Sequence, residues 1–171
     1  MTQAPPDQDR RHRAASRRSV LLLVLLLAVC YAVAALGGLA ASDSGSTYRS
    51  LDRPAWAPPS WLFGPVWTVL YATIAFSAWL VLRHRPLAAA RKEIVLWSLQ
   101  LALNLAWTPL FFGADRYGLA FLDICLLLAA LAVTMVLFRR RSPAAALLLV
   151  PYALWVLYAA SLNFAIWQLN S

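Results

Sequence analysis

The sequence contains few of the residues that carry hydrolytic, redox or metal chemistry. Only two cysteines and two histidines occur among its 171 residues. Cys30 and Cys125 lie in apolar runs without a partner at metal-ligand or redox spacing, so we expect both to be small buried hydrophobic residues. No HExxH motif, Ser/His/Asp set, glycine-rich phosphate loop or pair of carboxylates is present. These absences leave hydrolysis, phosphoryl transfer and metal binding without a foundation in the sequence.

Charged residues are also scarce, at 13% of the chain, whereas 62% of the residues are hydrophobic and the mean hydropathy is +0.66. A soluble domain would be closer to half apolar. The excess falls into five runs, each near the ~20 residues that a helix needs to cross a bilayer. The sequence therefore predicts an all-α integral membrane bundle of five transmembrane helices within residues 19–171, with spans at about 19–39, 65–82, 94–112, 118–138 and 144–169.

The basic residues predict how the bundle is oriented. The net charge is +8. The N-terminal tail, the joint after the second run and the joint after the fourth run carry five, four and three of the fifteen Lys and Arg residues. Because basic loops stay in the cytoplasm, this pattern places the N-terminus inside and the C-terminus outside, as expected for the cytoplasmic membrane of a bacterium. Topology thus accounts for the charge, and we expect no nucleic-acid partner.

The N-terminal region allows two interpretations. Residues 1–18 are polar and basic, and we expect a disordered cytoplasmic tail. The tail, the first run and a small-residue stretch ending at Ala40 also match a signal peptide. A signal peptide has an apolar core of ~7–15 residues, whereas this run is nearer twenty, which favours a retained first helix.

The third run places polar and aromatic side chains on one helix face. Gln100, Asn104, Trp107 and Phe111 follow i, i+4, i+7, i+11 spacing. Carboxamides that face lipid would cost a few kcal/mol, so this face should point inward. It is a candidate ligand-binding face; the alternative is hydrogen bonding between helices without a ligand.

A different face of the same run carries a pair of small residues. Ala102 and Ala106 form a small-xxx-small pair, which allows another helix to approach closely. That helix belongs either to the same chain or to a second copy, in which case the pair is a homodimer seam.

The fifth and second runs repeat the aromatic pattern. One broad stripe of the fifth run contains Trp155, Ala159 and Asn163, and the second run places Trp67 and Tyr71 on one face. A large ring beside a small residue and a carboxamide suits a flat apolar ligand with polar edges. In the fourth run, Asp123 is expected to have a structural role, with Arg116 as a candidate partner.

A proline-rich segment precedes the second run. The stretch RPAWAPPSWLFGPVWTVLY, residues 53–71, contains Trp56, Pro58, Pro59 and Trp61. Proline cannot lie in a helix interior, but Pro65 can open the second helix. We interpret residues 41–63 as a stiff, extended lid over a pocket that opens to the outer side. The alternative is an aromatic belt that anchors the protein at the membrane interface.

Three motifs in order resemble the TspO/MBR family of tryptophan-rich sensory proteins: YRSLDRPAWAPPSWLFGPVWTVLY, QLALNLAWTPLFF and PYALWVLYAASLNFAIWQLN. The resemblance covers about residues 48–170 and implies a five-helix bundle, commonly homodimeric, with a cavity under the first loop. It implies that tetrapyrroles such as protoporphyrin IX or haem-like compounds are ligands and that no cofactor is required. The matching cavity positions are Tyr48, Trp67, Gln100, Asn104, Phe111, Trp155, Ala159 and Asn163.

The chain departs from the family pattern in places. Thr47 precedes Tyr48 where the family often has tryptophan, and Arg53 replaces a lysine in the loop. No basic residue follows Arg141, so the cholesterol-recognition pattern of the last helix is absent.

These expectations support three functions. The first is a membrane receptor that senses, buffers or moves tetrapyrroles. The second is an enzyme that promotes light- and oxygen-dependent porphyrin breakdown, in which the resemblance implicates Trp67 and Trp155. The third, a metabolite transporter or membrane scaffold, is less favoured because the sequence has no internal repeat and no charged relay.

Overall fold

The computed structural model describes residues 6–40, 44–83 and 85–170. Five helical segments of this part of the chain are long and apolar enough to span a membrane, at Ser16–Ala40, Ser60–Leu82, Leu87–Gly113, Tyr117–Arg141 and Pro143–Leu169. No strand occurs among the described residues. The predicted all-α membrane bundle is therefore confirmed, and each predicted span overlaps one of these segments.

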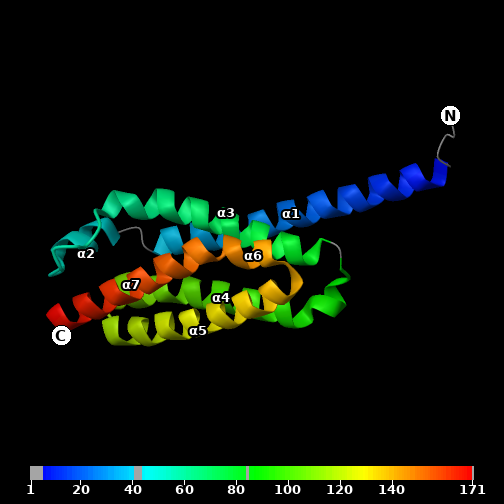
Figure 1. Ribbon diagram of the computed structural model, residues 1–171. Coiled ribbons are helices and arrows are strands. Elements are labelled where there is room, and N and C mark those ends of the chain that lie inside the picture. Colours follow the sequence, from blue (N-terminus) through cyan, green and yellow to red (C-terminus); the bar gives the residue numbers. More distant parts are fainter. Residues whose placement is uncertain (1–5, 41–43, 84, 171) are drawn as a thin grey trace.

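The helices are α1 (Pro6–Ala40), α2 (Ser44–Ser50), α3 (Phe63–Leu82), α4 (Arg91–Thr108), α5 (Tyr117–Arg141), α6 (Pro143–Leu148) and α7 (Val150–Leu169). Short 3₁₀ turns at Ser60–Leu62 and Leu87–Ala90 lead into α3 and α4, and a π turn at Pro109–Gly113 ends α4. Figure 1 shows α1 projecting beyond the other helices at its N-terminal end, with α2 at the opposite end of the bundle.

The N-terminal tail differs from the expectation. The helix α1 begins at Pro6, so residues 6–18 are helical rather than disordered, while residues 1–5 lie outside the described part. Arginine, alanine and glutamine favour helix, which lets the membrane helix continue into the polar tail. The predicted lid differs too, because α2 occupies part of the segment expected to be extended, and residues 41–43 are not described.

Prolines set several helix boundaries. Pro65 lies in the first turn of α3, as predicted, where its missing N–H costs nothing. Pro143 opens α6, whose N-cap Ser142 accepts a hydrogen bond from the Ala145 N–H. The last span breaks between α6 and α7 because Pro151 cannot donate a backbone hydrogen bond to the preceding turn.

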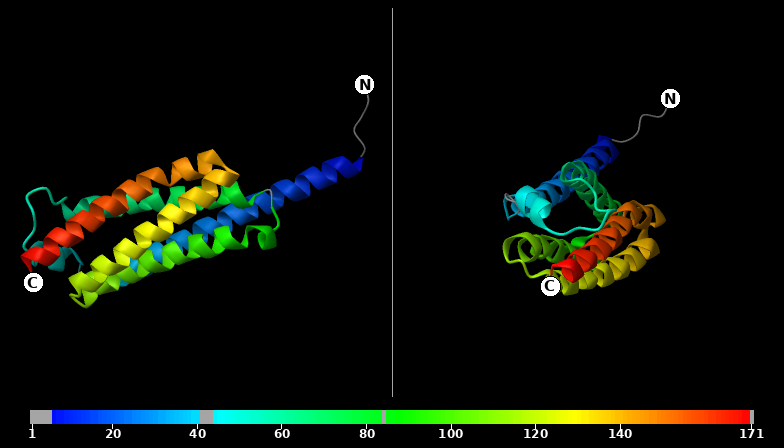
Figure 2. Two further views of the ribbon diagram at one scale, coloured as in Figure 1. Left: turned by 60° about the horizontal axis from the view of Figure 1, so that its bottom comes forward. Right: turned by 90° about the vertical axis from the view of Figure 1, so that its left-hand side faces the viewer.

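The membrane helices form a closed ring. The helix α1 packs against α3 and α4, α4 packs against α5, α5 against α6 and α7, and α6 and α7 return to α3. The end-on view in Figure 2 shows this arrangement. Large apolar side chains such as Leu126, Val133 and Leu154 are exposed on the outside, as lipid contact requires.

The ring is tied together by polar contacts at its basic end. The Arg141 guanidinium of α5 donates to buried Glu93 of α4 at 2.7 Å. In α3, the Ser77 hydroxyl donates to the Ala145 carbonyl of α6 at 2.7 Å. A ring closed in this way encloses space between its helices, and the predicted site residues lie around that space.

Candidate functional site

A cavity of about 610 Å³ lies inside the bundle, between side chains of all five spans and α2. Nine of the ten predicted ligand-binding residues line it: Tyr48, Trp67, Tyr71, Asn104, Trp107, Phe111, Trp155, Ala159 and Asn163. Helical spacing predicted that eight of these residues face inward, and Tyr48 was implied by the family resemblance. No group of three or more His, Cys, Asp and Glu that could hold a metal occurs in the described part of the chain.

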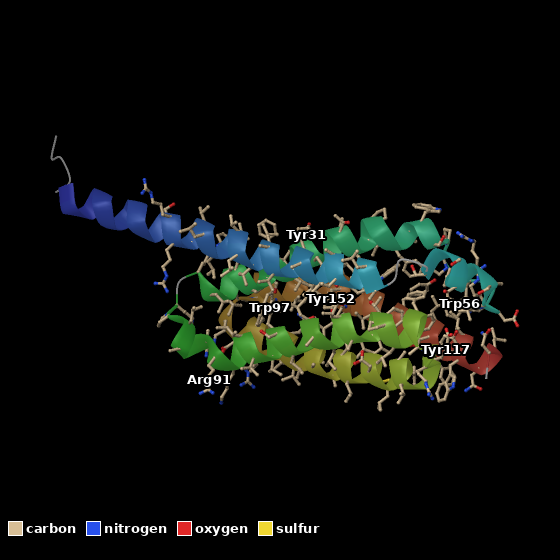
Figure 3. All side chains as sticks on the ribbon, turned by 180° about the vertical axis from the view of Figure 1, so that it is seen from behind. Tyr31, Trp56, Arg91, Trp97, Tyr117 and Tyr152 are labelled. Carbon is tan, nitrogen blue, oxygen red and sulfur yellow. The ribbon has the colours of Figure 1, made fainter. Side chains whose placement is uncertain are left out.

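Gln100 is placed differently from the prediction. Its side chain is buried and is not part of the cavity wall. The Tyr152 hydroxyl donates to Gln100 Oε1 at 2.8 Å, and Gln100 Nε2 donates to the Trp97 carbonyl oxygen at 2.9 Å. Figure 3 shows Trp97 and Tyr152 within the bundle. In the structure Gln100 forms the interhelical hydrogen bond that was the alternative to ligand contact, and a ligand contact of Gln100 remains a prediction.

Asn104 connects this buried network to the cavity. Its Oδ1 accepts a hydrogen bond from the Tyr71 hydroxyl at 2.7 Å, and its Nδ2 donates to the Tyr152 hydroxyl at 3.1 Å. Tyr71 and Asn104 line the cavity, whereas Tyr152 lies behind them and is fully buried. The two tyrosines fix the carboxamide in one orientation, and one N–H of Nδ2 is not used by these bonds.

A second carboxamide of the cavity wall, Asn163 of α7, is held by Trp107, about one turn from Asn104 on α4. The Trp107 indole N–H donates to Asn163 Oδ1 at 3.0 Å, and Asn163 Nδ2 donates to the Tyr117 carbonyl oxygen at 2.9 Å. Trp107 also stacks on Phe111, with ring centroids 4.9 Å apart. This cluster links α4, the start of α5 and α7 at the end of the bundle that carries α2, where Figure 3 labels Tyr117.

Two indoles complete the aromatic wall. Trp67 of α3 packs against Tyr71 and Tyr152, with centroid distances of 5.5 and 6.1 Å. Trp155 of α7 meets Phe63 edge to face at 6.0 Å. Trp155 Nε1 is buried and has no hydrogen-bond partner among the described residues. A buried indole N–H normally finds an acceptor, so this donor is available to a ligand that enters the cavity.

The segment after α2 is anchored over this end of the cavity by Tyr48. The Tyr48 hydroxyl donates to the carbonyl oxygen of buried Pro58 at 3.0 Å, and the Tyr48 ring meets Phe63 edge to face at 5.5 Å. The Arg53 guanidinium lies 4.6 Å above the same ring. Burial raises the pKa of Tyr48 above its ordinary value, so its hydroxyl stays protonated and donates.

The other predicted lid residues lie around the rim. Trp61 borders the cavity, whereas Trp56, Pro58 and Pro59 do not line it. The Trp61 side chain is largely exposed and that of Trp56 about half exposed. Trp56 instead contacts Tyr158 of α7, whose hydroxyl donates to the Trp56 carbonyl oxygen at 3.0 Å. Exposed indoles at one end of the bundle also fit the interfacial belt that was the alternative interpretation.

Sequence reasoning missed the part of the wall that comes from the first and fourth spans. Gly37 and Gly38 of α1 and Ile124 and Leu127 of α5 line the cavity. A small or aliphatic residue inside an apolar run carries no positional signal, although two adjacent glycines in a span could have suggested a wall without side chains.

Asp123, the remaining intramembrane charge, does not line the cavity. It is buried, its Oδ2 has no hydrogen-bond partner in the described part of the chain, and the ion pair considered with Arg116 is not formed among those residues. Ala102 is exposed and Ala106 half-buried on the outer surface of α4, where a second copy could reach them; the seam remains a prediction.

The comparisons with known proteins agree with this architecture. The model of the TspO/MBR family matches residues 26–168. The chain is 43% identical to the translocator protein of Ovis aries over 127 residues, which cover 72% of this chain and 74% of that protein. It is 40% identical to protein CrtK of Rhodobacter capsulatus over 130 residues, or 74% of this chain and 79% of that protein.

A longer match is found with the tryptophan-rich protein TspO of Chlorobaculum tepidum. The identity is 39% over 151 residues, which cover 84% of this chain and 92% of that protein. The family match covers the second, third and fourth spans in full, the first span from residue 26 onward, the last span up to residue 168, and the segment between α1 and α3. The chain is therefore a multi-pass membrane protein that belongs to the TspO/MBR family.

Proposed function

We propose that the protein is a membrane receptor that binds a tetrapyrrole, such as protoporphyrin IX or a haem-like compound, in the cavity of the helix bundle. The observation that carries this proposal is the aromatic wall of the cavity, in which Trp67 and Trp155 come from different helices. Its volume of about 610 Å³ lies within the ~300–1,000 Å³ typical of small-molecule sites. A flat, largely apolar macrocycle matches such a wall.

The polar groups of the cavity supply orientation. Asn104 and Asn163 are held rigidly by neighbouring tyrosine and tryptophan side chains, and Trp155 Nε1 is a buried donor without a partner in the described chain. Fixed donors in an apolar cavity favour a ligand that carries hydrogen-bond acceptors at its edge. Hydrogen bonds from these donors would replace those that the acceptors lose with water when the ligand enters the cavity. The propionate carboxylates at the edge of a porphyrin are such acceptors.

The segment around α2 would control entry and release. Tyr48 borders the cavity and is bonded to Pro58, so movement of this segment and opening of the cavity are linked. A receptor of this kind can buffer its ligand or pass it on, which accords with relatives named translocator and sensory proteins.

A titration of the purified full chain with protoporphyrin IX tests the proposal. Quenching of tryptophan fluorescence should saturate at one ligand per chain. The double variant Trp67→Phe, Trp155→Phe should bind at least tenfold more weakly, whereas Trp56→Phe, which changes an exposed indole outside the cavity, should bind as the wild type does. Unchanged affinity in the double variant, measured by porphyrin absorbance, would contradict this site.

Porphyrin breakdown driven by light and oxygen is a second candidate function. It is favoured by the presence of two indoles in the same wall, since a bound macrocycle would contact side chains that can be oxidised. Illumination of the complex in air should then give products that differ from those of free porphyrin. If either Trp67→Phe or Trp155→Phe binds the ligand but forms the same products as free porphyrin, the indoles take part in the reaction; identical products with the wild type would exclude this function.

A further inference from the structure

A second hollow lies on the outside of the bundle, along the lipid-facing side of α3. It is a groove of about 500 Å³ bordered by Tyr31 of α1 and Leu148 of α6. Its floor is formed by residues of α3 at i, i+3, i+4, i+7 and i+11 spacing, which places them on one helix face: Val69, Ala72, Thr73, Phe76 and Leu80. The small side chains in the middle of this face produce the hollow.

The groove presents hydrocarbon to its surroundings because its polar groups are bonded to backbone. The Thr73 hydroxyl donates to the Leu70 carbonyl oxygen at 2.8 Å, and the Thr68 hydroxyl donates to that of Gly64 at 2.9 Å. The Tyr31 hydroxyl donates to the Thr68 carbonyl oxygen at 3.1 Å, where α1 and α3 meet. An apolar groove of this kind suits an acyl chain.

The length of the groove matches one leaflet. From Thr68 to Leu80 the helix rises about 18 Å at 1.5 Å per residue. The hydrocarbon core of a bilayer is about 30 Å thick, so one leaflet contributes about 15 Å. An acyl chain that lies along α3 would therefore join its head group near Trp79 and Arg83, at the end of the bundle that carries the basic joints.

A cation is held at that end of the groove. Trp79 lines the groove, and its indole N–H is shared between the carbonyl and hydroxyl oxygens of Ser19 in α1, at 2.9 and 3.1 Å. The Arg83 guanidinium lies 4.6 Å from the centroid of the Trp79 ring. This cation–π contact positions the charge beside the groove while the side chain stays exposed.

The surroundings of Arg83 are basic. The Ser19 contact brings the preceding residues Arg17 and Arg18, both exposed, to the same end of the bundle. Within the part of the chain that the structure describes, Arg83 forms no ion pair, and the one ion pair found joins Arg141 to Glu93. An uncompensated cation next to an apolar groove is the arrangement that binds the head group of an anionic lipid.

We propose that this groove binds an anionic phospholipid of the leaflet on the arginine-rich side, with an acyl chain along α3 and the phosphate at Arg83. Trp79 would lie at the boundary between chain and head group, a depth that tryptophan prefers. The proposal does not depend on the ligand of the internal cavity.

Native mass spectrometry of the full chain in a mild detergent tests the head-group contact. Phosphatidylglycerol and phosphatidylcholine with the same acyl chains are titrated separately. The wild type should bind phosphatidylglycerol more tightly, and Arg83→Gln should weaken that binding about fivefold, the effect of about one basic residue at an anionic surface. Arg140→Gln removes the same charge from an exposed position at the same end and should retain wild-type binding. Equal affinities for the two lipids, or equal losses in the two variants, would overturn the proposal.

A second pair of variants tests the acyl-chain contact. Ala72→Phe fills the middle of the groove and should weaken binding of both lipids. Ala132→Phe adds the same ring to an exposed position on α5, outside the groove, and should not. Because both alanines are at the surface of the bundle, thermal unfolding should be similar for the two variants. Wild-type lipid binding by Ala72→Phe would show that the chain does not occupy the groove.

Discussion

Tyr152 and Gln100 form the centre of the buried polar network, with the Tyr152 hydroxyl donating to Gln100 Oε1 at 2.8 Å. The same hydroxyl accepts a hydrogen bond from Asn104 Nδ2, so it bridges two carboxamides of α4 from α7. Both tyrosine and glutamine are fully enclosed by protein. The network therefore joins the two helices behind the cavity and fixes the side chain of Asn104 in its wall.

Replacing Tyr152 by phenylalanine should lower the stability of the bundle. The change removes two interhelical hydrogen bonds and leaves Gln100 Oε1 buried without its donor, which should cost about 1–2 kcal/mol. Thermal unfolding in detergent measures the loss. Tyr158→Phe makes the same chemical change on α7, but its bond to the Trp56 carbonyl is at the surface, so the loss there should be much smaller. Equal unfolding temperatures for the two variants would contradict this account.

The two carboxamides of α4 should respond differently in ligand binding. Asn104→Leu removes a polar group from the cavity wall and should weaken protoporphyrin IX binding about tenfold, as expected for one lost hydrogen bond of ~1.4 kcal/mol. Gln100→Met keeps the side-chain volume behind the wall and should change affinity less than threefold while lowering stability. Fluorescence titration and thermal unfolding of both variants separate the two roles. A larger loss of affinity in Gln100→Met would return Gln100 to the site.

The inward faces of the helices were predictable because helical spacing determines which side chains share one face. The carboxamide of Asn104 is costly against lipid and must face inward, and helical spacing then places Trp107 on the same face. Spacing does not determine depth along the helix. Gln100 is one turn from Asn104 on the same face, but at its level Tyr152 fills the interior, and only the packing of α7 against α4 decides which carboxamide reaches the cavity.

The contribution of α1 could not be predicted for a different reason. Gly37 and Gly38 shape the cavity by having no side chain, and Ala34 by having a short one. Apart from the adjacency of the two glycines, their sequence signal is the same as that of ordinary residues in an apolar run. The helix α2 was missed because SGSTYRS has low helix propensity, and the neighbouring elements rather than local sequence hold Tyr48 in place.

The close approach of α5 and α7 should depend on glycine at position 118. A Cβ atom there would lie 3.0 and 3.1 Å from two atoms of the Trp167 ring. Gly118→Val adds branched bulk to this contact and should destabilise the bundle by about 1–3 kcal/mol. At Gly113 an added Cβ meets no atom within 4 Å, so Gly113→Val is the matched control and should lose much less. The prediction fails if thermal unfolding shows equal losses.

The final prediction concerns the end of α7, which holds the segment between α2 and α3 in place. The Asp52 N–H donates to Asn170 Oδ1 at 3.1 Å, and Asn170 Nδ2 donates to the Asp52 carbonyl oxygen at 2.9 Å. Asn170 does not line the cavity, so its replacement changes the attachment of the segment without changing a side chain that contacts the ligand.

If this segment controls release, Asn170→Ala should raise the dissociation rate of bound protoporphyrin IX about three- to tenfold, because two weak surface hydrogen bonds of ~0.5–1 kcal/mol each no longer oppose opening. Stopped-flow fluorescence measures this rate after the complex is mixed with an excess of a haem-binding apoprotein, which captures the released porphyrin. Ser161→Ala removes a hydroxyl of α7 that bonds only to the carbonyl oxygen of Leu157 in the same helix, and should dissociate at the wild-type rate. An unchanged rate in Asn170→Ala would contradict this role of the segment and mean that the ligand leaves by another route. The contact between α1 and α3, where the Tyr31 hydroxyl donates to the Thr68 carbonyl oxygen, would then be tested as the exit with Tyr31→Phe.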